Sequence, residues 1–285
     1  MFIKDDYKIK IFQRDGIELK GYYCENNKDT CVVSFAGLSG TCDNMFCAIA
    51  DEVINTGISF LFANTQASYK VKELKQKLAD GETKLILRGG AYEDYDETIK
   101  DMMEWVEYIV NKGFEKIYLV GASLACNRLV SLLNAKQYPN VKKLILICPQ
   151  DISVQVDNDM MIESQENIIS NKGDELLAQK VFGYCEICGR TYKDLFSRKD
   201  INNLPYLTED SNFSMLKAID IPILSIIGEC DQGLSYSNLS AEEAMQRLQK
   251  HNSNIQYKII ANAKHSFKNY EEELAKYIVQ YLKED

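Results

Sequence analysis

The sequence predicts an α/β fold in which a mostly parallel central sheet is flanked by helices and carries an inserted helical cap. Two observations lead to this prediction. Short apolar runs, typical of strands buried on both faces, alternate with amphipathic helical patterns along most of the 285 residues. Such alternation favours parallel strands with helices on both sides of the sheet. It is interrupted between Pro149 and Ile219, where polar helical segments separate irregular pieces, as expected for an insertion.

The chain begins with a predicted β-hairpin. Its strands are Lys8–Phe12 and Glu18–Tyr23, and Arg14–Asp15–Gly16 is the turn signal between them. The stretch from Ala67 to Gly90 is less regular and predicts a basic helix-like piece, the short run Leu85–Leu87 and a Gly89–Gly90 turn. Around that stretch the pattern predicts buried strands at Cys31–Ala36, Ile58–Phe62 and Ile117–Val120, and helices at Asn44–Asn55 and Tyr95–Asn111.

The second half continues the alternation around the insertion. A helix follows Ser123 to about Tyr138, and the insertion itself contains polar helical segments. The strands predicted here are Lys143–Cys148, Ile221–Gly228 and Ile255–Ile260, and the helices are Met160–Ser170, Glu175–Phe182, Thr191–Phe196, Ser240–Lys250 and Ser266–Leu282. We therefore expect residues 1–149 and 220–285 to form one core and residues 150–219 to form the cap.

Charge and composition narrow the kinds of protein that fit. With 33 basic and 42 acidic residues the formal net charge is −9, which disfavours binding to the phosphate backbone of nucleic acids. The N-terminus lacks the apolar core of a signal peptide, and no apolar run reaches the roughly 18 residues of a membrane span. We therefore expect a cytoplasmic protein whose nine cysteines are reduced thiols. Nothing in the sequence indicates the oligomeric state.

Ser123 is the candidate nucleophile. It lies at the centre of the small-residue turn Gly121–Ala125, between the predicted strand Ile117–Val120 and a helix. A strand, a tight turn with a central serine and a helix form the context of a nucleophile elbow, whose strained backbone makes the serine Oγ project above the sheet. The usual pattern is G-x-S-x-G, and here Ala125 replaces the final glycine. A serine in such a turn can also simply be a helix N-cap.

A base and an acid follow the serine in the order that this architecture requires. His265 lies between the last predicted strand and the last helix, and Asp231 follows the strand Ile221–Gly228, with Glu229 as second choice. The other histidine, His251, ends a predicted helix, where we expect it to cap the helix or face solvent. A serine, an acid and a histidine at the carboxyl ends of strands predict a catalytic triad.

An oxyanion hole requires two backbone N–H donors. One should come from Leu124, the residue after the serine, and the other from Leu38, in the loop after the predicted strand Cys31–Ala36. Many such loops carry a histidine before the glycine, and here that position is Ala36.

Other candidate sites are weaker. Cys185 and Cys188 form a CxxC motif without a second pair of ligands, and a zinc site needs at least three protein ligands. The Gly37–Gly40 loop lacks the Lys-Ser/Thr of a P-loop. Cys126 lies close to the serine in sequence, and we expect it to pack in the interior. We therefore expect neither a metal ion nor a cofactor.

These motifs resemble the α/β-hydrolase superfamily, and more narrowly the branch of fungal siderophore esterases and related uncharacterised bacterial serine hydrolases. The resemblance implies Ser123 as nucleophile, Asp231 as acid and His265 as base, beneath a helical cap. The alanines at positions 36, 122 and 125 depart from the usual pattern and bear on the choice of substrate. The resemblance is carried by Gly37–Gly40, Ile58–Asn64, Arg88–Met102, Gly113–Val130, Leu144–Ile152, Thr191–Ile201, Ile223–Asp231 and Asn262–Phe267, and it covers most of the chain.

The sequence thus predicts a serine hydrolase that cleaves a carboxylic ester of a small molecule through an acyl-enzyme on Ser123. A thioester or a lactone is an alternative substrate. Two other hypotheses stay open. The same triad could transfer the acyl group or cleave an amide, and the chain could be a non-catalytic binding protein that keeps the fold. The identity of the substrate and the size of its acyl chain cannot be read from the sequence.

Overall fold

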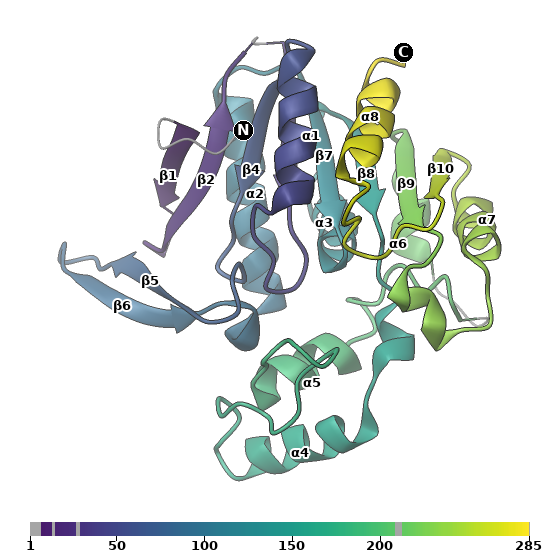
Figure 1. Cartoon of the computed structure of the whole chain (residues 1–285). Coiled ribbons are helices and arrows are strands. Elements are labelled where there is room, and N and C mark those ends of the chain that lie inside the picture. The colour runs from purple at the N-terminus through teal and green to yellow at the C-terminus, as the bar shows by residue number, and fades with distance from the viewer. Residues whose placement is uncertain (1–6, 13–14, 27–28, 209–212, 285) are drawn as a thin grey trace.

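A computed structural model describes residues 7–12, 15–26, 29–208 and 213–284. Its main sheet has eight strands in the order β1-β2-β4-β3-β7-β8-β9-β10 (Figure 1). All neighbouring pairs from β4 to β10 are parallel, and the β1–β2 and β2–β4 pairs are antiparallel. The strands are β1 (Lys8–Phe12), β2 (Glu18–Cys24), β3 (Thr30–Phe35), β4 (Ser59–Ala63), β7 (Lys116–Ala122), β8 (Val141–Ile147), β9 (Ile223–Gly228) and β10 (Ile255–Ile260).

Helices cover both faces of this sheet, which explains why its central strands are mostly apolar. Every residue of β4 and of β9 is buried. Figure 1 shows α1 and α8 on one face and α2 and α3 on the other. The covering helices are α1 (Asn44–Asn55), α2 (Tyr95–Asn111), α3 (Leu124–Ala135), α7 (Ala241–His251) and α8 (Glu271–Leu282). The prediction of a mostly parallel sheet between helices is confirmed.

The predicted N-terminal hairpin is present, because β1 pairs with β2 in antiparallel register. Arg14 of its expected turn lies outside the described residues. The helix-like piece predicted in the stretch from Ala67 to Gly90 was wrong. Instead of a basic helix-like piece, β5 (Lys72–Lys77) and β6 (Thr83–Arg88) form a separate two-stranded antiparallel sheet that projects from the body (Figure 1).

The chain between β8 and β9 contributes no strand to the main sheet within its described residues. Figure 1 shows α4 and α5 beyond the ends at which β7, β8 and β9 point. The helix predicted at Glu175–Phe182 is absent, because isolated antiparallel bridges join Leu176 to Cys188 and Val181 to Cys185 there. The helical elements of this segment are the 3-10 turn η3 (Ile152–Gln155), α4 (Asn158–Ile169), α5 (Gly189–Ser197) and α6 (Ser214–Lys217).

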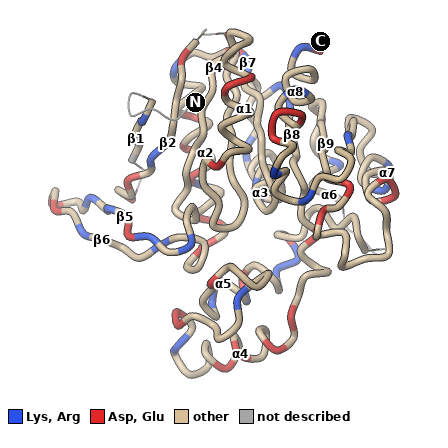
Figure 2. Tube along the Cα trace, viewed as in Figure 1, with Lys and Arg blue, Asp and Glu red and all other residues tan. Residues whose placement is uncertain are grey.

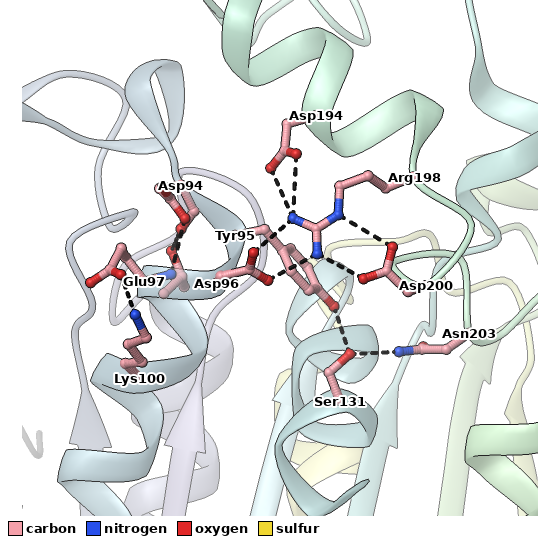
Figure 3. A network of polar contacts seen from close by, with 11 residues as sticks. Asp94, Tyr95, Asp96, Glu97, Lys100, Ser131, Asp194, Arg198, Asp200 and Asn203 are labelled. Carbon is pink, nitrogen blue, oxygen red and sulfur yellow. Dashed lines mark hydrogen bonds and ion pairs between the residues drawn. The ribbon is translucent and has the colours of Figure 1, made fainter. Parts of the chain in front are cut away.

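Ion pairs and hydrogen bonds fix this segment to the sheet helices. Arg198, just after α5, donates to both carboxylate oxygens of Asp96 in α2 at 2.9 and 3.0 Å (Figure 3). The same guanidinium contacts Asp194 at 3.3 Å and Asp200 at 2.7 Å. The guanidinium of Arg198, shared by three carboxylates, thus links the segment between β8 and β9 to α2.

A buried ion pair lies where the segment meets the core. Arg128 of α3 donates to both carboxylate oxygens of Glu93 at 2.6 Å, and the two side chains are almost fully buried. A second nitrogen of Arg128 lies 3.4 Å from the Ala36 carbonyl oxygen, and Thr191 of α5 donates to the Glu93 carbonyl at 2.9 Å. One cluster therefore joins α3, the end of β3 and α5. Such a pair is costly to break, because removing one partner leaves the other charge buried.

Charged residues are interspersed over the trace. Figure 2 shows Lys and Arg beside Asp and Glu along most elements, with no continuous basic face in this view. None of the helices in the described part of the chain is both long and apolar enough to cross a bilayer.

Candidate active site

Ser123 lies in the turn between β7 and α3, and its backbone is strained. Its φ is 57° and its ψ is −130°, a left-handed conformation that is uncommon for residues other than glycine. The Ser123 amide donates to the Ile147 carbonyl at 2.8 Å, which ties the turn to β8. A Cβ at Gly121 would lie 2.9 Å from the Ala125 carbonyl oxygen, so the strand and the helix approach each other too closely for a side chain there. Strain of this kind is retained where the surrounding structure enforces it.

The Ser123 hydroxyl is not used as a helix cap. Ser123 occupies the N-cap position of α3, but its side chain makes no capping hydrogen bond. Ser123 therefore does not have the common structural role of a helix N-cap. Ser123 instead lines a cavity of about 670 Å³.

The loop after β3 lies against this serine. A Cβ built on Gly37 would come within 2.7 Å of the Ser123 Cβ and 3.1 Å of its Oγ, so only glycine fits. The next residue, Leu38, lines the same cavity, and its amide donates no hydrogen bond within the described chain. The Leu124 amide, at the first position of α3, is likewise without an acceptor among the described residues. Both amides can donate a hydrogen bond to a ligand oxygen.

Asp231 and His265 meet above the carboxyl ends of β9 and β10. The His265 Nδ1 lies 2.9 and 3.1 Å from the two carboxylate oxygens of Asp231. The Asp231 side chain is 2 % exposed and that of His265 is 30 % exposed. Burial raises the pKa of Asp231, but hydrogen bonds from His265, Cys148 and the Gly233 amide outweigh it and hold that pKa below its usual value. An ionised Asp231 that accepts a hydrogen bond from Nδ1–H leaves Nε2 free to act as a base.

His265 lines the same cavity as Ser123. Both residues are described, and no hydrogen bond joins the Ser123 hydroxyl to the His265 ring. Catalytic hydrogen bonds in unliganded sites are often long and tighten only when substrate binds. The structure thus brings Ser123 and His265 to one cavity and joins Asp231 to His265, and Asp231 itself is not part of the cavity wall.

Cys148, the residue after β8, belongs to this site and was not identified from the sequence. Its thiol is buried and donates a hydrogen bond to Asp231, and its backbone has a φ of 46°. Burial raises the pKa of the Cys148 thiol well above its usual value, so the thiol stays protonated. Ligand atoms of Cys148, Asp231 and His265 lie within 4.8 Å of one another, a spacing that could hold a metal ion. The Asp231–His265 hydrogen bond already uses two of these three ligands.

The remaining candidates have other contacts. Glu229, the second choice for the acid, is exposed and accepts from the Asn262 amide at 2.9 Å. His251 is the last residue of α7, as predicted, but its ring is half-buried and stacks on Phe213 with the ring centroids 3.9 Å apart. The ring therefore does not simply face solvent. Cys185 lies 3.2 Å from the Ser39 hydroxyl and Cys188 lies 3.3 Å from that of Thr191, and all nine cysteines, each of them described, are free thiols.

A larger cavity, of about 870 Å³, lies between α2 and α5. Arg198 and several of its acidic partners line it, and neither Ser123 nor His265 does. Ser123 and His265 therefore line the smaller of these two cavities.

Comparison with known proteins supports the fold. By sequence, neither a protein-family model nor a curated protein matches the chain. By structure, Est1E from Butyrivibrio proteoclasticus with bound ferulic acid is similar, with a TM-score of 0.66, 16 % identity and coverage of 96 % of this chain and 97 % of that one. The α/β hydrolase GrgF from Penicillium sp. sh18 has a TM-score of 0.67, 14 % identity and coverage of 95 % and 96 %. The Pyrococcus furiosus esterase Pf2001 has a TM-score of 0.59, 16 % identity and coverage of 97 % and 89 %.

Proposed function

The chain has the α/β-hydrolase fold, and from that fold and the surroundings of Ser123 we propose that it is a serine hydrolase. Its substrate would be a carboxylic ester of a small molecule, with a thioester or a lactone as variants of the same chemistry. The observation that carries the proposal is the strained Ser123, whose hydroxyl caps nothing and lines the cavity that also holds an Asp231-bound His265.

The chemistry begins with proton transfer from the Ser123 Oγ to the Nε2 of His265. The oxygen attacks the ester carbonyl, and the negative charge on the carbonyl oxygen is stabilised by the amides of Leu38 and Leu124. Asp231 stabilises the imidazolium that forms. His265 then protonates the departing alcohol, which leaves an acyl group on Ser123. Water, activated by the same imidazole, releases the carboxylic acid and restores the serine. No cofactor takes part in these steps.

We also propose that residues 150–219 form a cap over this site, between core segments 1–149 and 220–285. Gln150, Gln155, Phe182 and Tyr184 of that segment line the cavity that contains Ser123. A substrate in the cavity would therefore contact side chains of the cap as well as of the core. This arrangement gives the cap a direct influence on substrate choice.

The test compares Ser123→Ala with the wild type on acyl esters of graded chain length, lactones and aryl esters. We expect hydrolysis of at least one substrate by the wild type and its loss in Ser123→Ala. Ser170→Ala, an exposed serine at the end of α4, is the matched control and should keep full activity. A fluorophosphonate should add its mass to the wild type and to the control, but not to Ser123→Ala. Wild-type turnover by Ser123→Ala would overturn the proposal.

Product analysis separates hydrolysis from acyl transfer. With a competing alcohol or amine present, a hydrolase releases mainly the free acid, whereas an acyltransferase forms the new ester or amide. If transfer predominates, the acyl-enzyme on Ser123 still forms, but its acyl group passes to the alcohol or amine instead of water, and the protein is an acyltransferase.

A further inference from the structure

A short turn of the cap points two aromatic rings at the mouth of the Ser123 cavity. Val181 and Cys185 are joined by reciprocal backbone hydrogen bonds of 2.8 and 2.9 Å. Between them Phe182 has a φ of 55° and Gly183 a φ of 75°, as in a type I′ turn. A positive φ is a genuine outlier for a residue as bulky as phenylalanine, and such strain points to a role for the side chain.

The base of this turn is fixed while its tip is open. Val181 and Cys185 are buried, and the Cys185 sulfur lies 3.2 Å from the hydroxyl of Ser39, in the loop that also holds Gly37 and Leu38. The Lys70 ammonium donates to the Tyr184 carbonyl at 3.0 Å. The turn is thus held against the loop that approaches Ser123.

Three aromatic side chains remain exposed around the opening, and we call Phe182, Tyr184 and Tyr236 the aromatic rim. They are 41 %, 56 % and 48 % exposed, and all three line the cavity of Ser123 and His265. The Phe182 and Tyr184 ring centroids lie 6.3 Å apart with the planes tilted by 36°. Exposed apolar surface at the mouth of a cavity is typical of a binding site, because a ligand that covers this surface removes it from water.

The charges around the cavity indicate what kind of ligand fits. Among the described residues that line it there is no Lys or Arg. The Lys70 ammonium lies outside the lining, 5.9 Å from the centre of the Tyr184 ring, and already donates to the Tyr184 carbonyl, so an anionic group inside the cavity would have no lining cation as its partner. Asp43 is the one carboxylate among these lining residues, and it already caps α1 by accepting from the Phe46 amide at 3.2 Å. The lining therefore favours an uncharged ligand.

We propose that the aromatic rim binds a planar, uncharged aromatic ring of the ester substrate. This inference rests on the proposed hydrolase function, because only a hydrolase would have an ester substrate. The binding of an aromatic ring itself does not depend on turnover. Aromatic rings stack on or pack edgewise against one another with a gain beyond that of area alone. A saturated ring of similar size offers comparable apolar area without a planar π-face, so it is the comparison that isolates the effect.

The first test measures binding without turnover. Benzamide and cyclohexanecarboxamide, both neutral, are titrated into the wild type and Phe182→Gly and followed by calorimetry. We expect benzamide to bind about threefold to tenfold more tightly to the wild type, and this preference to vanish in Phe182→Gly. Glycine suits the left-handed backbone at position 182, so this variant should fold at least as stably as the wild type. Equal affinities in the wild type, or a preference that survives in Phe182→Gly, would overturn the inference.

The second test uses two matched substrate pairs: methyl phenylacetate with methyl cyclohexylacetate, and benzyl acetate with cyclohexylmethyl acetate. The aromatic member of at least one pair should have the higher kcat/KM, mainly through a lower KM, and Phe182→Gly should remove the difference. Ile169→Ala removes an 82 % exposed side chain outside the cavity and should change neither value. Loss of all activity in Ser123→Ala together with equal rates within both pairs would leave the hydrolase proposal standing and overturn the aromatic rim.

A second copy of the chain is the rival occupant of these exposed rings. If the rim mediates self-association, Phe182→Gly would have a lower mass than the wild type by sedimentation at micromolar concentration. That result would overturn the assignment of the rim to a substrate ring.

Discussion

Asp231 holds the imidazole on which the proposed chemistry depends. We expect Asp231→Asn to lower kcat/KM by about 10⁴-fold, because an amide neither stabilises the imidazolium nor enforces the Nδ1–H tautomer. The fold should persist, since asparagine has the same shape. Steady-state kinetics on a substrate hydrolysed by the wild type, with circular dichroism to verify the fold, measure both effects.

The same substitution changes the pH dependence of stability. The pKa of Asp231 lies below its usual value in the folded chain, so the ionised carboxylate stabilises the fold above the unfolded pKa of about 3.9. That contribution is lost as the pH falls through the folded pKa. Asp231→Asn should therefore lose less stability than the wild type on acidification below about pH 4. Parallel acid profiles for the two proteins, or unchanged kcat/KM, would contradict this account.

Single residues differ in how far the sequence reveals them. The sequence could predict that Ser123, Asp231 and His265 lie close together, because each follows a predicted strand. Parallel strands bring their carboxyl ends to one edge of the sheet. Cys148 also follows a strand, but a cysteine in an apolar run resembles any packed thiol. Its thiol lies beside Asp231 and its backbone is left-handed, and no sequence pattern signals either feature.

Among the elements, the sequence identified those that bury a periodic apolar face. The helices Asn44–Asn55 and Tyr95–Asn111 have the predicted bounds. The helix predicted at Ser266–Leu282 begins only at Glu271. Two larger errors lie where pairing partners decide the structure. The β5 sequence KELKQK suits a helix by propensity, but its backbone pairs with β6. The segment Glu175–Phe182 is polar enough for a surface helix, yet its bridges to Cys185 and Cys188 depend on contacts that propensity does not describe.

The link between α5 and α2 gives a prediction about these elements. Arg198→Gln removes the cation shared by Asp96, Asp194 and Asp200 and leaves three carboxylates close together. Because the guanidinium is partly exposed, we expect a loss of about 1 kcal/mol in the free energy of unfolding. The loss should shrink at high ionic strength, which screens the remaining carboxylates. Urea unfolding at low and high salt measures it.

Arg190→Gln is the control for this experiment. Arg190 pairs with Asp174 at 3.0 Å, but those side chains are 66 % and 75 % exposed. An ion pair so open to water should contribute almost nothing. Equal losses in the two variants would mean that the Arg198 cluster does not hold the segment more firmly than an ordinary surface pair.

For the molecule as a whole, the question is whether the segment between β8 and β9 is an independent unit. The sequence predicts limits for this segment from its composition, but how the segment packs on the core depends on contacts among side chains far apart in the chain. Ile187, Tyr192 and Ile201 are buried in the same hydrophobic cluster as the core strands. Hydrogen bonds also cross the boundary, from Tyr206 to the Pro149 carbonyl at 2.7 Å and from Asn203 to the Asn127 carbonyl at 2.9 Å.

We therefore predict that the segment and the core unfold in one transition, because separating them would expose this shared cluster and leave the buried Arg128–Glu93 pair without its cover. Trp105, the only tryptophan, is fully buried in the core, and its fluorescence reports core unfolding in urea. Cys185 and Cys188 are buried in the segment, so pulse alkylation of these two thiols, read by peptide mass spectrometry, reports the segment. The two midpoints should coincide. Alkylation of both thiols at urea concentrations that leave the Trp105 signal native would instead identify the segment as a separately unfolding cap.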